Sequence, residues 1–239
     1  MKETGMLFKT EMVRALLDGR KTQTRRIVKG QEFWGDAAIN ARPIDGGLWR
    51  IEGATQINPK LHDNSVTFVD VKSPFGQAGD RIWVRETWQH SNYPFGPYED
   101  GCDVFYRADF LNDVHGPDGE LSPEGRYRFW NASIHMPRTA SRILLEITDV
   151  RIERLHDINE ADAIAEGLAA ITKDGKLFKH GIPDLDGLPG RDNLGWPWHE
   201  WEVDPRKAFK KIWESTGGQW EPNQWVWVYE FKLMETGAA

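Results

Sequence analysis

Gly19-Arg20-Lys21-Thr22-Gln23-Thr24-Arg25-Arg26 is the most informative segment of this sequence, because it places four cations and two hydroxyls directly after a predicted helix. The residues before it are apolar at positions that share one helix face: Met12, Val13, Leu16 and Leu17. Asp18-Gly19 predicts the end of this helix, because glycine accepts the left-handed backbone that commonly closes helices. Met6-Leu7-Phe8, ahead of the helix, predicts a short first strand.

The basic segment has two interpretations. Its cations are Arg20, Lys21, Arg25 and Arg26. Charge alone favours an exposed edge strand, whose basic side chains discourage pairing with other chains. The alternative is a site that handles a nucleic acid or a nucleoside.

The composition limits the partners that such a site can have. The chain has 239 residues, 39% of them hydrophobic and 28% charged, and a formal net charge of −7. This is typical of a globular protein with one large domain or two small ones. Non-specific binding to duplex nucleic acid usually needs a strong positive excess, so a nucleoside fits this chain better than a long polymer. Most of the 12 tryptophans are expected to fill the core, although such rings also stack on bases.

Several other classes of protein are disfavoured. No apolar run approaches the roughly 20 residues that a membrane-spanning helix needs, and the first residues lack the features of a signal peptide. The single cysteine, Cys102, excludes an internal disulfide and a cysteine-cluster zinc site. The histidine spacing fits no zinc motif, and no glycine-rich phosphate loop is present. We therefore expect a cytoplasmic protein with no metal, no cofactor and no membrane partner.

Strand patterns outnumber helix patterns in the rest of the chain. The clearest strands cover residues 81–88, 141–154 and 224–233, the last with Trp225, Trp227, Tyr229 and Phe231 on one face. Short helices are predicted at 160–166, capped by Asn159, and at 204–213, capped by Asp204. These patterns favour one α+β domain over residues 1–239, a mostly antiparallel β-barrel with two or three short helices. Long insertions are predicted at about 30–78, 109–127 and 172–203.

Two carboxylates and one histidine are further candidates. Glu86 shares a strand face with Ile82 and Val84, so it would be buried and would need a partner, for which Arg25 or Arg26 is available. Glu166 ends a helix beside Gly167, where the helix dipole disfavours a carboxylate and so hints at a function. His135 lies between Ser133 and Arg138, two residues before a proline that stiffens the turn.

Four motifs, in order along the chain, resemble those of the ASCH domain family, which has the PUA-like fold. They are the basic segment 19–26, Gly79-Asp80 followed by Glu86, Ala163-Ile164-Ala165-Glu166-Gly167, and the aromatic strand 225–231. The stretch 130–142 resembles the version of the domain found in phage and prophage proteins. The family core is much shorter than this chain, which implies that the three long segments are insertions into a PUA-like barrel.

The resemblance also implies an activity. Some bacterial ASCH proteins are amide hydrolases that act on 4-acetylcytidine with a lysine, a threonine three residues later and a glutamate. Lys21, Thr24 and Glu166 stand at those positions, as base, nucleophile and acid/base respectively. Other relatives are ribonucleases or RNA-binding domains, so two alternatives stay open: a module that binds a nucleoside or single-stranded RNA, and a ribonuclease. The expected binding residues are Arg20, Arg25, Arg26, Glu86, Trp88, His135 and Arg138, with Trp88 or a loop tryptophan stacking on a base.

The hydrolase interpretation makes a demand on the backbone. In a regular strand, residues three apart point to opposite faces, so Lys21 and Thr24 would diverge. They converge only if the chain turns or bulges near Lys21. We therefore predict an irregularity there, whereas a straight strand over residues 20–26 would contradict a joint role for the pair.

Overall fold

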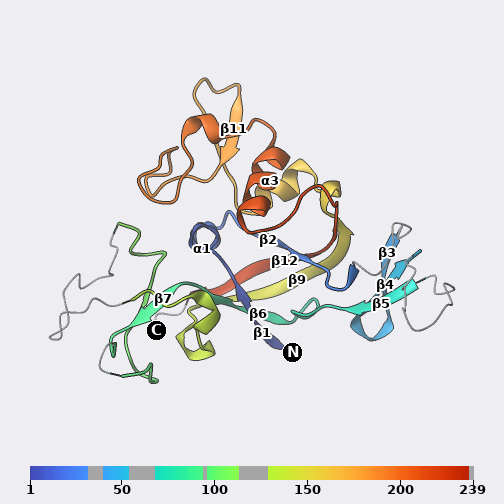
Figure 1. Ribbon diagram of the computed structural model, residues 1–239, viewed down its shortest axis with the longest axis horizontal. Coiled ribbons are helices and arrows are strands. Elements are labelled where there is room, and N and C mark those ends of the chain that lie inside the picture. Colours follow the sequence, from blue (N-terminus) through green and yellow to red (C-terminus); the bar gives the residue numbers. More distant parts are fainter. Residues whose placement is uncertain (32–39, 54–67, 94–95, 113–128, 237–239) are drawn as a thin grey trace.

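The structure is a computed structural model, and it describes residues 1–31, 40–53, 68–93, 96–112 and 129–236. Its centre is a five-stranded sheet (Figure 1). In spatial order the strands are β1 (Glu3–Leu7), β6 (Arg81–Arg85), β9 (Ile143–Arg154), β12 (Trp225–Thr236) and β2 (Gln23–Ile27). All neighbours pair antiparallel except β1 and β6, which run parallel. The predicted α+β class with mostly antiparallel strands is therefore confirmed.

Strand β12, between β9 and the edge strand β2, is buried on both faces over its first half. The predicted aromatic face is confirmed, because Trp225, Trp227, Tyr229 and Phe231 all belong to the main core. The opposite face carries Val226 and Val228, which pack in a second cluster with Phe209 and Trp213. Burial on both sides explains why the strand is apolar at almost every position.

The predicted closed barrel is not found. Strands β1 and β2 form the two edges of the sheet, and within the described residues no strand pairing joins them. The physical reason lies in the connection between them. After Leu7 the chain turns at once into helix α1 (Thr10–Leu17) and returns as β2, so the helix lies in the space between the two edges (Figure 1).

Two further helices cover the β2 side of the sheet. In α2 (Glu160–Ala165) the Asn159 side chain accepts from the Asp162 amide at 2.9 Å. In α3 (Pro205–Ser215) the Asp204 side chain accepts from the Arg206 amide, also at 2.9 Å. Both predicted caps are confirmed, and each satisfies an amide that the helix leaves unpaired.

Smaller sheets pack around this centre. β3 (Asn40–Ile44), β4 (Leu48–Glu52) and β5 (Phe68–Lys72) form an antiparallel sheet in the predicted first insertion. β7 (Trp88–His90) pairs with β8 (Val104–Tyr106), and β10 (Ala169–Thr172) pairs with β11 (Phe178–Gly181). Short 3₁₀ turns lie at Asp45–Gly47, Ser133–His135, Arg138–Ala140, Leu155–Asp157 and Trp198–Glu200.

The insertions share the main core rather than building their own. Ile51 of β4 is fully buried in the main cluster, and Trp49 packs edge-to-face on Trp227 at 6.2 Å. Most of the predicted second insertion lies outside the described residues. No helix in the described part of the chain has the length and apolar character needed to span a bilayer.

Candidate active site

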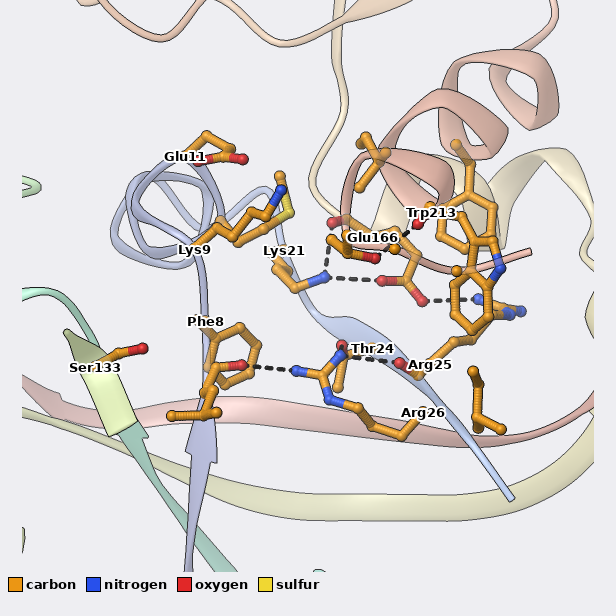
Figure 2. Close-up of a pocket in the computed structure, with 18 of the residues that line it drawn as sticks. Phe8, Lys9, Glu11, Lys21, Thr24, Arg25, Arg26, Ser133, Glu166 and Trp213 are labelled. Atoms are coloured by element: carbon orange, nitrogen blue, oxygen red, sulfur yellow. Dashed lines mark hydrogen bonds and ion pairs between the residues drawn. The ribbon is translucent and has the colours of Figure 1, made fainter. Parts of the chain in front are cut away.

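A cavity of about 860 Å³ lies where the two edges of the central sheet approach each other. Its walls come from the end of β1, the start of α1, strand β2 and the C-terminal half of α3 (Figure 2). Five of the residues predicted for the site line this one cavity: Lys21, Thr24, Arg25, Arg26 and Glu166. They come from two places in the chain that the fold brings together.

The backbone around Lys21 is irregular, as predicted. Gly19 has a φ of +72°, and the Lys21 amide donates to the Ala15 oxygen at 2.9 Å, which carries the chain around the end of α1. Lys21 then makes a single bridge with Glu166, and the regular strand begins only at Gln23. Because of this break, Lys21 and Thr24 both line the cavity.

Gly167 allows the two segments to approach. Its φ of +114° is disfavoured for residues with a side chain. A Cβ at this position would lie 2.9 Å from the Ala15 Cβ and 3.3 Å from the Lys21 Cβ. The Glu-Gly pair at the end of α2 is therefore what lets Glu166 reach Lys21.

Lys21 and Glu166 form a buried pair. The Lys21 Nζ donates to the Glu166 Oε2 at 2.8 Å and to the Glu166 backbone oxygen at 2.7 Å. Both residues are at most 4% exposed. Burial lowers the pKa of Lys21, although the Glu166 carboxylate opposes the shift. A neutral amine has two N–H groups, and these two acceptors would satisfy both, so its lone pair would be left to accept a proton.

Arg25 holds the other oxygen of the same carboxylate. Its Nη1 donates to the Glu166 Oε1 at 3.1 Å, and its Nη2 donates to Glu153 at 2.5 Å and Asp162 at 3.0 Å. The Arg25 side chain is fully buried, so its charge is compensated by these three carboxylates. Glu166 is thus fixed between Lys21 and Arg25, as Figure 2 shows.

Thr24 is held by Arg26. The Arg26 Nη1 donates to the Thr24 Oγ1 and to the Arg25 backbone oxygen, both at 2.9 Å, and its Nη2 donates to the Leu7 oxygen at 2.9 Å. The guanidinium also lies 5.3 Å from the centre of the Phe8 ring. Burial lowers the pKa of Arg26, and within the described residues no carboxylate makes an ion pair with it. A cation that donates to a hydroxyl oxygen stabilises the alkoxide and leaves the hydroxyl proton available for transfer.

Arg20 lies outside the cavity lining. It donates to the Gly167 oxygen at 2.5 Å and to Asp18 at 2.8 Å. Its position indicates a structural role, because these contacts tie the end of α1 to the end of α2.

The partner predicted for Glu86 is wrong. Glu86 is buried, as expected, but it accepts from the Arg142 Nε at 3.1 Å and Nη2 at 3.2 Å rather than from Arg25 or Arg26. The reason is strand order: β9 and β12 lie between β6 and β2, so Glu86 cannot reach the basic segment. Burial raises the pKa of Glu86, and Arg142 opposes the shift.

Three other candidates also lie outside the cavity lining. Trp88 is only 3% exposed and packs against Tyr98 at 5.3 Å, so its rings are not available to stack on a base. His135 and Arg138 are exposed on two 3₁₀ turns, and Arg138 pairs with Glu3 at 3.1 Å.

Some lining residues were not predicted from the sequence. Phe8, Phe209 and Trp213 form an apolar wall, and Lys9 and Lys29 also line the cavity. Phe209 and Trp213 lie on the apolar face of the predicted helix at 204–213. Such a face is expected to be buried, but its pattern is the same whether it packs in the core or lines a cavity. Asp162 lies four residues before Glu166, a helical spacing that could have suggested a joint role.

Within the described residues, no group of three histidine, cysteine or acidic side chains is arranged to hold a metal ion. Comparison of the chain with protein-family models, curated proteins and solved structures finds no match in any of the three. The ASCH resemblance therefore stays a prediction that rests on the motifs.

Proposed function

We propose that this chain is an amide hydrolase that acts on acylated cytidine-type nucleosides, with Thr24 as nucleophile. The observation that carries the proposal is that a lysine with a lowered pKa and an arginine-held threonine line one cavity. The order and spacing of Lys21, Thr24 and Glu166, which resemble those of the ASCH amidohydrolases, support the same assignment.

The first half-reaction would transfer the acyl group to the enzyme. The Thr24 Oγ attacks the amide carbonyl while the neutral Lys21 amine takes the hydroxyl proton. The tetrahedral intermediate collapses, the C–N bond breaks, and the proton passes from Lys21, with Glu166 as relay, to the leaving nitrogen. The products are an ester on Thr24 and the free exocyclic amine of the nucleoside.

The second half-reaction would regenerate the enzyme. Water attacks the ester carbonyl while Lys21 accepts a proton from the water. The Thr24 Oγ then leaves and takes that proton back, and the acyl group departs as a carboxylic acid. Among the described residues no hydrogen bond joins the Lys21 Nζ to the Thr24 Oγ1, so both transfers require these groups to approach when substrate binds.

Arg26 is suited to stabilise the negative charge that develops on the carbonyl oxygen. Its three hydrogen bonds go to neutral oxygens, and among the described residues no carboxylate makes a direct ion pair with it, although the Glu166 carboxylate acts on its charge from a greater distance. Charged donors fixed beside the reacting atom are often the largest single contribution to such catalysis.

The cavity walls favour a small substrate with both apolar and polar parts. Phe8, Phe209 and Trp213 provide aromatic surface next to the charged floor. Each of these side chains is at most 7% exposed, so together they bound the cavity as an apolar wall. The cavity volume of about 860 Å³ lies within the range of about 300–1,000 Å³ that is usual for small-molecule sites.

The test is incubation with 4-acetylcytidine, other acylated nucleosides and a short RNA, followed by mass analysis of the products. The proposal expects release of cytidine, loss of this activity in Thr24→Ala, and no loss in Thr22→Ala. Thr22 is a matched control because it is exposed and lies outside the cavity lining. Shortened RNA that persists in Thr24→Ala would identify a ribonuclease instead. Ligand binding without any product would identify a binding module.

A further inference from the structure

The cavity has the opposite charge to the rest of the chain. Its lining carries five cations, Lys9, Lys21, Arg25, Arg26 and Lys29, against two carboxylates, Glu11 and Glu166. The whole chain has a formal net charge of −7. A concave site with one sign of charge concentrates ligands of the other sign.

Only some of these cations are neutralised by the protein itself. Lys21 and Arg25 both pair with the buried carboxylate of Glu166. Within the described residues, Lys9, Arg26 and Lys29 make no ion pair with a carboxylate. Glu11 is the single carboxylate of the lining that also makes no ion pair within the described residues. Positive charge therefore exceeds negative charge among the unpaired groups of the cavity.

The unpaired cations are not equivalent. Arg26 lies beside Thr24, at the reacting end. Lys9 follows the end of β1 and Lys29 follows the end of β2, so they stand on the two sheet edges that border the cavity. Both lysines are exposed, and the Lys9 Nζ also donates to the Ser215 oxygen at 2.7 Å, which holds it against the end of α3. An anionic group of the ligand can thus bind at the rim while Arg26 stays at the reaction centre.

We propose that the substrate is a nucleotide, and that Lys29, helped by Lys9, binds its phosphate. This inference rests on the proposed function, since it names the substrate class of the same site. Phosphate is the ordinary anionic substituent of a nucleoside, and lysine binds it as a point charge. The excess of charge is small and the chain as a whole is acidic, so one phosphate fits better than a long polynucleotide.

The experiment measures binding, so that it does not depend on catalysis. The dissociation constants of cytidine 5′-monophosphate, cytidine and a ten-nucleotide RNA are measured by calorimetry at low and high salt. We expect the monophosphate to bind about fivefold tighter than cytidine at low salt, and the difference to shrink at high salt. Lys29→Gln should remove the difference. Lys207→Gln is the matched control, because Lys207 is exposed on α3 away from this cavity and should preserve the difference.

The outcomes separate this inference from the proposed function. Equal affinity for cytidine and its monophosphate, or an unchanged preference in Lys29→Gln, would overturn the inference even if acetylcytidine is hydrolysed. Much tighter binding of the RNA than of the monophosphate would also overturn it. A phosphate preference that Lys29→Gln abolishes supports the inference as a statement about binding, even if Thr24→Ala shows that no hydrolysis occurs.

Discussion

Arg26 links the two edges of the central sheet, because its Nη2 donates to the Leu7 oxygen of β1 at 2.9 Å while its own backbone belongs to β2. The same guanidinium donates to the Thr24 hydroxyl. A side chain therefore spans the gap that strand pairing leaves open in the described residues. The contact that joins the two edges is also the contact that holds the proposed nucleophile.

Replacement of Arg26 by lysine should therefore affect catalysis more than folding. A lysine keeps the charge but cannot donate to Thr24 and Leu7 from a fixed planar group. We expect Arg26→Lys to lower kcat by about 100-fold. Steady-state kinetics with acetylcytidine would measure this, with Arg42→Lys as the control because Arg42 is exposed on β3. Full activity in Arg26→Lys would exclude the oxyanion role.

Removal of the Glu166 charge should destabilise the fold. In Glu166→Gln, the buried cations Lys21 and Arg25 lose a shared counter-ion, although the shape of the side chain is kept. Loss of one partner from a buried pair typically costs about 3 kcal/mol. Urea unfolding would measure the change, and the exposed Glu160→Gln in the same helix should stay within about 0.5 kcal/mol of the wild type. Equal stability of the two variants would show that the pair is not a structural requirement.

The pH dependence of the reaction should reflect Lys21. Its pKa lies below the usual 10.5 because of burial, so its basic form accumulates at a lower pH than that of an ordinary lysine. We expect kcat/KM to rise with pH and to reach its plateau below pH 10.5. Glu166→Gln should move this rise in kcat/KM to still lower pH, because Glu166 is the largest of the influences that raise the pKa of Lys21. A rise in kcat/KM that moves to higher pH in Glu166→Gln would contradict the assignment of Lys21 as base.

Tyr229 should limit stability in alkali. Burial raises its pKa from the usual 10.0 to about 12. Between these values the unfolded chain releases the proton and the folded chain retains it, so stability falls as the pH rises. Tyr229→Phe should lessen this fall, but it should cost about 1 kcal/mol at neutral pH because the hydrogen bond with the Ser73 Oγ, 2.8 Å long, is lost. Unfolding curves at pH 7 and pH 11 would measure both effects; an unchanged alkaline slope would speak against the assignment.

Gly167 offers a test of the close approach between α1 and α2. Gly167→Ala combines an unfavourable φ of +114° with a contact of 2.9 Å to the Ala15 Cβ. We expect a loss of stability of about 1–3 kcal/mol, together with loss of activity as Glu166 moves away from Lys21. Gly175→Ala is the matched control, because its φ is +71° but no atom lies within 4 Å of the added carbon. If the two variants behave alike, the crowding at Ala15 has no consequence of its own.

The sequence predicted local features better than distant partners. The caps Asn159 and Asp204, and the break near Lys21, follow from interactions within a few residues of the chain. The partner of Glu86 could not be predicted, because alternation along a strand shows which residues share a face but not which strand lies beside it. Trp88 was misjudged for the same reason: the pattern gives two faces, and only the packing of β7 shows that this ring is buried.

The Lys21–Glu166 contact can form only late in folding. These residues are 145 positions apart. Lys21 precedes β2 and Glu166 follows β9, and the two strands are held together only through β12, which pairs with both. Closing so long a loop lowers the entropy of the chain, and only the packing of the assembled core offsets this loss. The proposed site is therefore a property of the completed fold, and a partly folded chain with a formed α1 and β2 would still lack the Lys21–Glu166 pair.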